Sequence, residues 1–176
     1  MSTITRDHGF RRSGVLESAM MLDEMTVELI ADGCHIPLEL LNMVYRQKGA
    51  DKIALVTDSM RAAGTDDRES LLGSLKNGQK VLVEDGVAKL PDRSAFAGSV
   101  ATMDRLVRTA LSAGIPLCDA VRMATSTPAK LLGIRNKGIL FPGNDADVVL
   151  FDSNIAVSGV WVGGDLLWQT FQEEKS

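Results

Sequence analysis

Two short apolar segments separated by one helical pattern set the strongest limit on how this chain can fold. Residues 26–31 (TVELIA) and 52–57 (KIALVT) are nearly continuous apolar runs, which is typical of strands buried on both faces of a parallel sheet. Between them, a stretch with apolar residues at helical spacing begins near Pro37 and ends at Gly49. Strand, helix and strand within about thirty residues predict a βαβ unit with parallel strands.

The pattern becomes mixed after the second of these strands. Residues 79–92 contain an Asp85-Gly86 turn between two β-type segments and predict a hairpin. Ser99 is the expected N-cap of the following helix, which Gly114 ends. Further helices are expected at about 116–124 and 127–133, followed by strands at 148–151, 157–162 and 166–168. The chain is therefore expected to be an α/β fragment followed by helices and an antiparallel β segment, and two parallel strands need further neighbours for a stable sheet.

Composition excludes several classes of function. The net charge of −4 gives no electrostatic attraction to nucleic acid, and aromatic residues make up only 5% of the chain. No stretch approaches the roughly 20 apolar residues of a membrane span, and no apolar run follows the N-terminal charges as in a signal peptide. We expect a cytoplasmic protein that binds neither nucleic acid nor membrane, in which Cys34 and Cys118 are reduced, buried thiols.

Two polar side chains near the ends of the predicted strands are candidates for chemistry. Asp58 directly follows residues 52–57, so its carboxylate would project from the carboxyl end of a parallel strand and could act as a general base and acid. The alternative is that Asp58 begins a loop or caps a helix. His35 lies two residues after the Asp32-Gly33 turn and could equally be a surface residue or a hydrogen-bonded structural residue.

Five segments in a fixed order are more specific than any single residue. They are ELIADGCH (28–35), LVTDSMRAAG (55–64), AGSVATMDRLVR (97–108), RMATSTPAKLLGI (122–134) and GILFPGNDADVVLFD (138–152). The series resembles the N-acetylglucosamine-6-phosphate deacetylases of the amidohydrolase superfamily, from about Gly9 to Trp168. The last segment is shared widely among amidohydrolases, whereas the first three point to the amino-sugar deacetylases.

The resemblance implies a division of the chain into three parts. Residues 1–14 are poorly patterned. Residues 15–136 correspond to the C-terminal part of a (β/α)8 barrel, with a hairpin insertion near 79–92. Residues 137–176 correspond to the C-terminal strands of a small composite β-sandwich domain. The expected fold class is therefore α/β, a partial barrel followed by strands of a β-sandwich.

The resemblance also assigns roles to particular residues. Asp58 corresponds to the catalytic aspartate, which in the family takes a proton from a metal-bound water and passes one to the leaving amine. His35 corresponds to a histidine that helps to bind the sugar phosphate. Arg11, or its neighbour Arg12, corresponds to an arginine that contacts phosphate, although this pair could also be a solvated basic patch. A loop whose backbone lines the substrate corresponds to Ala97, Gly98 and Ser99.

The resemblance implies a divalent metal, zinc or similar, for the complete enzyme. In the family a glutamate and two histidines from earlier strands hold it, whereas this chain has only His8 and His35. We therefore expect no metal ligands in this chain, no activity of the chain alone, and a partner that is either a second copy or the missing N-terminal half. The substrate would be an amino-sugar phosphate. The alternatives are a non-catalytic sugar-phosphate-binding or partner-pairing module, and a gene remnant.

Overall fold

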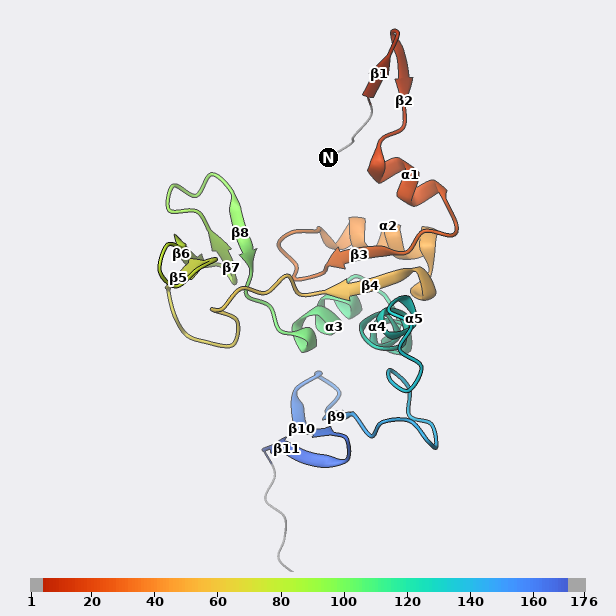
Figure 1. Ribbon diagram of the computed structural model, residues 1–176, viewed down its shortest axis with the longest axis vertical. Helices are drawn as coiled ribbons and strands as arrows, with labels where there is room; N and C mark the ends of the chain where they lie inside the picture. The colour runs from red at the N-terminus through yellow and green to blue at the C-terminus, as the bar shows by residue number, and fades with distance from the viewer. Residues whose placement is uncertain (1–4, 171–176) are drawn as a thin grey trace, which may run out of the picture.

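The predicted βαβ unit forms the centre of the computed structural model, which describes residues 5–170 (Figure 1). Strands β3 (Val27–Ile30) and β4 (Ile53–Val56) pair in parallel, with Leu29 opposite Leu55. Helix α2 (Leu38–Lys48) connects them, followed by the short 3-10 helix η1 (50–52). The apolar runs thus form the buried parallel strands that their pattern predicts.

Three further helices complete the core around these strands. Helices α3 (Met103–Ser112), α4 (Leu117–Ala124) and α5 (Ser126–Leu131) all contact β4, and α2 packs against α3. Each helix turns its apolar stripe inward, because residues three and four apart lie on one helix face. The large side chains that are at most 2% exposed in this core are Leu41, Ile53, Leu55, Leu106, Ile115, Met123 and Ile155. Full burial of each contributes on the order of 1.5–3 kcal/mol.

The sequence predicts no helix or strand in residues 1–14, whereas the described part of this segment forms regular structure. Strands β1 (Thr5–Asp7) and β2 (Phe10–Arg12) form an antiparallel hairpin, and helix α1 (Val15–Met21) follows. The two turn residues, His8 and Gly9, have φ values of 47° and 86°. Positive φ at both central residues is what a tight hairpin turn requires, and a histidine gives little warning of it.

The predicted hairpin at 79–92 belongs to a larger antiparallel sheet. Strands β5 (Glu69–Leu72), β6 (Gln79–Glu84), β7 (Val87–Lys89) and β8 (Phe96–Ser99) pair in sequence order. Residues 97–99, expected in a loop, therefore lie in a strand. Figure 1 shows this sheet beside the carboxyl ends of β3 and β4.

Ser99 is not the N-cap of α3, as we expected from the sequence. The N-cap is Thr102. The backbone of Ser99 pairs instead with the segment after β4: its N–H donates to the Asp58 carbonyl (3.1 Å), and its carbonyl accepts from the N–H of Met60 (2.9 Å). A residue whose backbone N–H and carbonyl are both paired in this way cannot also begin a helix.

A three-stranded antiparallel sheet follows the helices. Strands β9 (Val148–Phe151), β10 (Val157–Val162) and β11 (Asp165–Gln169) lie in the order β11-β10-β9, as the three predicted strands require. Figure 1 places this sheet below α3 and α4, on another side of the core from β5–β8. Within residues 5–170, no helix has the length and hydrophobicity that a membrane span needs.

The two cysteines differ from the sequence-based expectation in their burial. Both are free thiols, but Cys34 is only half-buried and Cys118 is exposed. Cys118 lies in the first turn of α4, on the side that faces solvent. Neither is therefore a buried core thiol.

Candidate active site at the ends of the parallel strands

Each of the two parallel strands is followed by an aspartate at the same distance. Asp32 lies two residues beyond the end of β3, and Asp58 lies two residues beyond the end of β4. Because the strands are parallel, both acids lie at the same edge of the sheet. Their environments differ, since Asp32 is 1% exposed whereas Asp58 is exposed to solvent.

Asp32 accepts hydrogen bonds from its own loop. Its Oδ1 accepts from the backbone N–H groups of Cys34 and His35, both at 2.9 Å, and its Oδ2 lies 2.8 Å from Nδ1 of the His35 ring. Burial raises the pKa of Asp32, but the hydrogen bonds from His35 and Cys34 outweigh burial, and the net pKa lies below its ordinary value of 3.8. The carboxylate is therefore ionised at neutral pH.

The ring of His35 is held from a second side by Phe96. The two ring centroids are 5.1 Å apart and the ring planes are inclined by 59°, a tilted geometry that aromatic rings favour. Phe96 is the first residue of β8, so this contact joins the loop after β3 to the four-stranded sheet. The His35 side chain remains 20% exposed and is accessible to a ligand.

Asp58 lies in a strained backbone conformation at the edge of an open pocket. Its φ is 48°, in the left-handed region that a non-glycine residue rarely adopts. The pairing of its carbonyl with Ser99 fixes this segment against β8. The pocket has a volume of about 490 Å³. Its walls come from the segment after β4 and from β5 and β8, and they include Asp58, Met60, Arg61, Leu72, Phe96 and Gly98.

Gly98 allows the backbone of β8 to approach this segment. Its φ is +110°, and an added Cβ would lie 3.7 Å from both the Asp58 carbonyl oxygen and the Met60 side chain. The space would admit a methyl group, but the backbone conformation would be strained for any residue other than glycine. The shape of this pocket wall therefore depends on glycine at position 98.

The structure brings five of the six predicted site residues together. Asp58, Ala97 and Gly98 line the same pocket. Ser99 is fully buried behind it, and His35 reaches the pocket wall through Phe96. Arg11 is not part of this group. It is exposed on β2, and Figure 1 shows the β1–β2 hairpin extending beyond α1, away from the ends of β3 and β4.

Arg105 is a site neighbour that sequence reasoning missed. Its guanidinium donates to the carbonyl of Gly86 at 2.8 Å and lies 3.6 Å from Sγ of Cys34. Arg105 thus links α3, the β6–β7 turn and the loop after β3. No local pattern signals this contact, or that of Phe96 with His35, because each joins residues 19 to 71 positions apart in the chain. Asp32 was readable only as a turn residue, although its spacing of three from His35 suits a side-chain pair.

The donor groups in residues 5–170 do not fit a metal centre. No group of three or more His, Cys, Asp or Glu side chains in this part of the chain could hold a metal ion. A catalytic zinc usually takes about three protein ligands and a water. Any metal that acts beside Asp58 would therefore need ligands from outside these residues.

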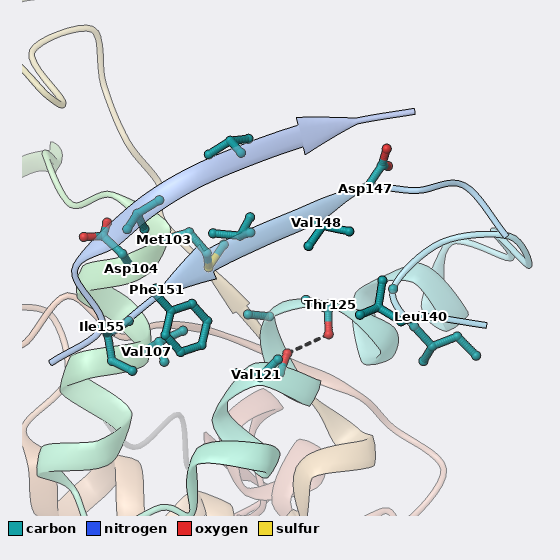
Figure 2. Close-up of a pocket in the computed structure, with 16 residues that line it drawn as sticks. Met103, Asp104, Val107, Val121, Thr125, Leu140, Asp147, Val148, Phe151 and Ile155 are labelled. Carbon is teal, nitrogen blue, oxygen red and sulfur yellow. Dashed lines mark hydrogen bonds between the residues drawn. The ribbon is translucent and has the colours of Figure 1, made fainter. Parts of the chain in front are cut away.

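A second pocket, of about 520 Å³, lies between the helices and the β9–β11 sheet (Figure 2). Figure 2 shows Phe151 between β9 and the helices that carry Val107 and Val121. Its lining is mostly apolar, and its two acids are already paired, Asp104 with Arg108 at 2.7 Å and Asp147 with Lys137. None of the predicted site residues lines it. We interpret it as a packing cleft between the two parts of the structure.

The parallel βαβ unit with acids at its strand ends defines an α/β protein whose candidate site lies where such folds place their ligands. The sequence profile of the amidohydrolase family matches residues 5–167. The chain belongs to this family.

Comparison with known proteins narrows the group of relatives. The chain is 37% identical over 161 residues to the N-acetylglucosamine-6-phosphate deacetylase of Lysinibacillus sphaericus, a match that covers 91% of this chain and 40% of that protein. It is 32% identical to a putative N-acetylgalactosamine-6-phosphate deacetylase of Escherichia coli K12, over 89% of this chain and 91% of that protein. The two relatives carry names that differ in the sugar.

Solved structures of N-acetylglucosamine-6-phosphate deacetylases also match this chain. The crystal structure of N-acetylglucosamine-6-phosphate deacetylase from Thermotoga maritima matches with a TM-score of 0.81 and 31% identity, over 90% of this chain and 42% of that one. The N-acetylglucosamine-6-phosphate deacetylase of Mycobacterium smegmatis matches with a TM-score of 0.80. The chain thus spans about two fifths of the length of these structures and of the Lysinibacillus relative.

Proposed function

We propose that this chain is the C-terminal part of a deacetylase that hydrolyses the N-acetyl group of N-acetylglucosamine 6-phosphate, giving glucosamine 6-phosphate and acetate. One observation carries this proposal. Residues 58–61 and 96–98, far apart in the sequence, line one pocket, and His35 from a third segment packs against Phe96 in its wall. These are the segments that resemble the deacetylases most specifically.

The proposed architecture follows from the same resemblance. Residues 15–136, with β3, β4 and the surrounding helices, would form the last part of a barrel, and the β5–β8 sheet would be an insertion over its carboxyl end. Residues 137–176 would supply strands to a β-sandwich, with 1–14 as a separate N-terminal segment. The short, half-exposed strands of β9–β11 support this division, because such a sheet needs a second layer to bury its apolar face.

In the proposed reaction Asp58 transfers the proton. Its exposed carboxylate at the pocket edge would accept a proton from the water that attacks the acetyl carbonyl. When the C–N bond breaks, the same group would return that proton to the departing nitrogen, so the products are a free amine and acetate. His35 would bind the 6-phosphate, and the backbone of residues 97–99 would line the sugar. Arg11 would contact phosphate only from another subunit or after the hairpin moves.

A second candidate function follows from the donor groups. Residues 5–170 hold no group of three or more His, Cys, Asp or Glu side chains that could bind a metal ion, so without ligands from elsewhere the chain would bind an amino-sugar phosphate or a partner without chemistry. Mass spectrometry tests whether the chain alone retains a metal ion. After purification with zinc and dialysis, we expect well below one equivalent of metal per chain. One equivalent retained would contradict the view that the ligands lie elsewhere.

Complementation tests the proposed activity directly. The chain should be co-expressed with the part of the Lysinibacillus deacetylase that it does not match, and acetate release measured with the 6-phosphates of N-acetylglucosamine and N-acetylgalactosamine. Acetate release by the pair, and by neither part alone, is the expected result. A folded, metal-loaded pair that releases no acetate would contradict the proposal and favour the binding module.

A further inference from the structure

The carboxylate of Asp32 is the most deeply buried charge of the site, and the proposed proton transfer does not use it. It is 1% exposed, and the three groups that contact it come from the two residues Cys34 and His35. A buried charge is costly unless hydrogen bonds satisfy it. Here two backbone N–H groups and one ring nitrogen do so, which makes the loop after β3 a small closed unit.

The contact with the ring constrains the chemical form of His35. An ionised carboxylate can only accept hydrogen bonds, so the ring atom 2.8 Å from Oδ2 must carry the proton. That atom is Nδ1. Since the two ring nitrogens are distinct, fixing the proton on Nδ1 leaves Nε2, on the other side of the ring, to meet a ligand.

The other contacts of the loop restrict rotation of the ring. Phe96 packs against it at 5.1 Å. The backbone N–H of His35 bonds to the same carboxylate as its ring does, so backbone and side chain are anchored at one point. A histidine held at Nδ1 and on one face has a defined direction for Nε2.

We propose that Asp32 is a positioning residue, which fixes the Nδ1–H form and the orientation of His35 so that Nε2 meets an anionic oxygen of the substrate. This inference rests on the proposed function, in which His35 binds the 6-phosphate. In the complex both ring nitrogens would donate, Nδ1–H to the Asp32 carboxylate and Nε2–H to the phosphate, so the ring would bridge two anions.

The tautomer can be measured without any activity. The full chain, labelled with ¹⁵N-histidine, is sedimented and studied by solid-state NMR about two pH units above the usual histidine pKa of about 6.5. The chain has only two histidines, so a His8→Gln variant assigns both rings. We expect His35 to carry its proton on Nδ1. A ring protonated on Nε2 in the native chain would overturn the proposal.

Asp32→Asn tests the cause of this preference. The amide can still accept from the backbone with Oδ1, but its NH₂ group would face Nδ1, so the ring proton should move to Nε2. Phe96→Leu, the matched control, should leave the proton on Nδ1. An unchanged tautomer in a folded Asp32→Asn chain would contradict the role of Asp32. If that variant does not fold by circular dichroism, the tautomer of the native chain still decides the question.

Kinetics of the complemented enzyme test the consequence. Asp32→Asn should raise KM for the 6-phosphate sugar about 10-fold, the lower end of the effect seen when a ligating histidine loses its second partner, and should change kcat less. A change in kcat alone would contradict a role in phosphate binding. If the native pair releases no acetate, the proposed function fails, whereas the NMR result on Asp32 and His35 stands independently.

Discussion

The ends of β3 and β4 place the same residue type in the same position of two neighbouring strands, yet the two environments are opposite. Asp32 is buried and accepts three hydrogen bonds, whereas Asp58 is exposed on a pocket and has a strained backbone. Position at a strand end therefore indicates where a site lies, and burial with hydrogen bonding indicates what each acid does there. A carboxylate occupied by its own loop is suited to hold a neighbour, and an exposed one is suited to exchange a proton.

The largest expected effect is the loss of kcat when Asp58, at the end of β4, is replaced. In the complemented enzyme, Asp58→Asn should lower kcat by about 10²–10⁴-fold, because an amide cannot accept the proton from the attacking water. KM should change little, since asparagine has nearly the same shape. Asp32→Asn is the matched variant at the other strand end and should leave most of kcat. Acetate release should be measured for both variants. Near-native turnover of Asp58→Asn would contradict the assignment of proton transfer to Asp58.

Stability should show the reverse order. Asp32→Ala leaves buried donors without an acceptor and should lower the free energy of unfolding by about 3 kcal/mol, the cost of losing charge-assisted bonds to a buried group. Asp58→Ala removes an exposed side chain, and the left-handed backbone there tolerates alanine less well than aspartate, so the loss should be about 1 kcal/mol or less. Urea unfolding of the full chain measures both. Equal losses would show that burial does not distinguish the two acids.

The burial of Asp32 also predicts that the stability of the fold depends on pH. The pKa of Asp32 is lower in the folded chain than its ordinary value of 3.8, so the ionised form stabilises the fold above that pH. This stabilisation is lost as the pH falls below 3.8 and through the folded pKa, because the folded state must then take up a proton that the unfolded chain already holds. Thermal melts from pH 6 downward should show a smaller acid-dependent loss in Asp32→Asn than in the native chain, after the other carboxylates, common to both, are subtracted. Parallel curves would contradict the prediction.

The smallest expected effect is on stability and concerns the contact between Arg105 and the β6–β7 turn, which lies beside the loop after β3. Gly86 has a φ of +74°, and a Cβ there would lie 2.9 Å from the Arg105 guanidinium that bonds its carbonyl. Gly64 has nearly the same φ, +75°, with nothing within 4 Å. Both alanine variants should lose about 1–2 kcal/mol from backbone strain, and Gly86→Ala should lose about 0.5–1.5 kcal/mol more for the disturbed hydrogen bond. Urea unfolding gives this difference, and equal losses would show that the Arg105 contact does not stabilise the turn.

The sequence predicted those parts of the fold that depend on local pattern. The apolar runs that became β3 and β4 and the stripes of α2, α3 and α4 follow from burial on known faces, and the strands β9 and β10 have the predicted bounds. Strand β8 was missed because Phe96–Ser99 has small residues and no alternation, so only pairing with Asp58 and β7 makes it a strand. The N-terminal hairpin depends on the left-handed backbone of His8, which its residue type does not signal.

In the candidate site, too, the sequence predicted the residues that a local pattern or motif marks and missed those that depend on tertiary contacts. Asp58 was readable because it follows a buried strand directly, and His35 because its motif resembles a family. The role of Asp32 depends on its burial, and the contact of Phe96 with His35 joins two segments that the sequence cannot bring together. Long-range contacts of this kind arise from tertiary packing, which composition and periodicity do not encode.

The pair of parallel strands at the centre of the molecule has edges to which further strands could pair. Among residues 5–170, β3 and β4 pair only with each other in their sheet. The pair therefore has two outer edges, and each edge can accept one further strand. A single strand added at one edge satisfies that edge and presents a new one of the same kind, so addition can continue without limit. A body that reaches both edges ends the process at one copy. We therefore expect the kind of assembly to depend on how many of these edges a partner covers.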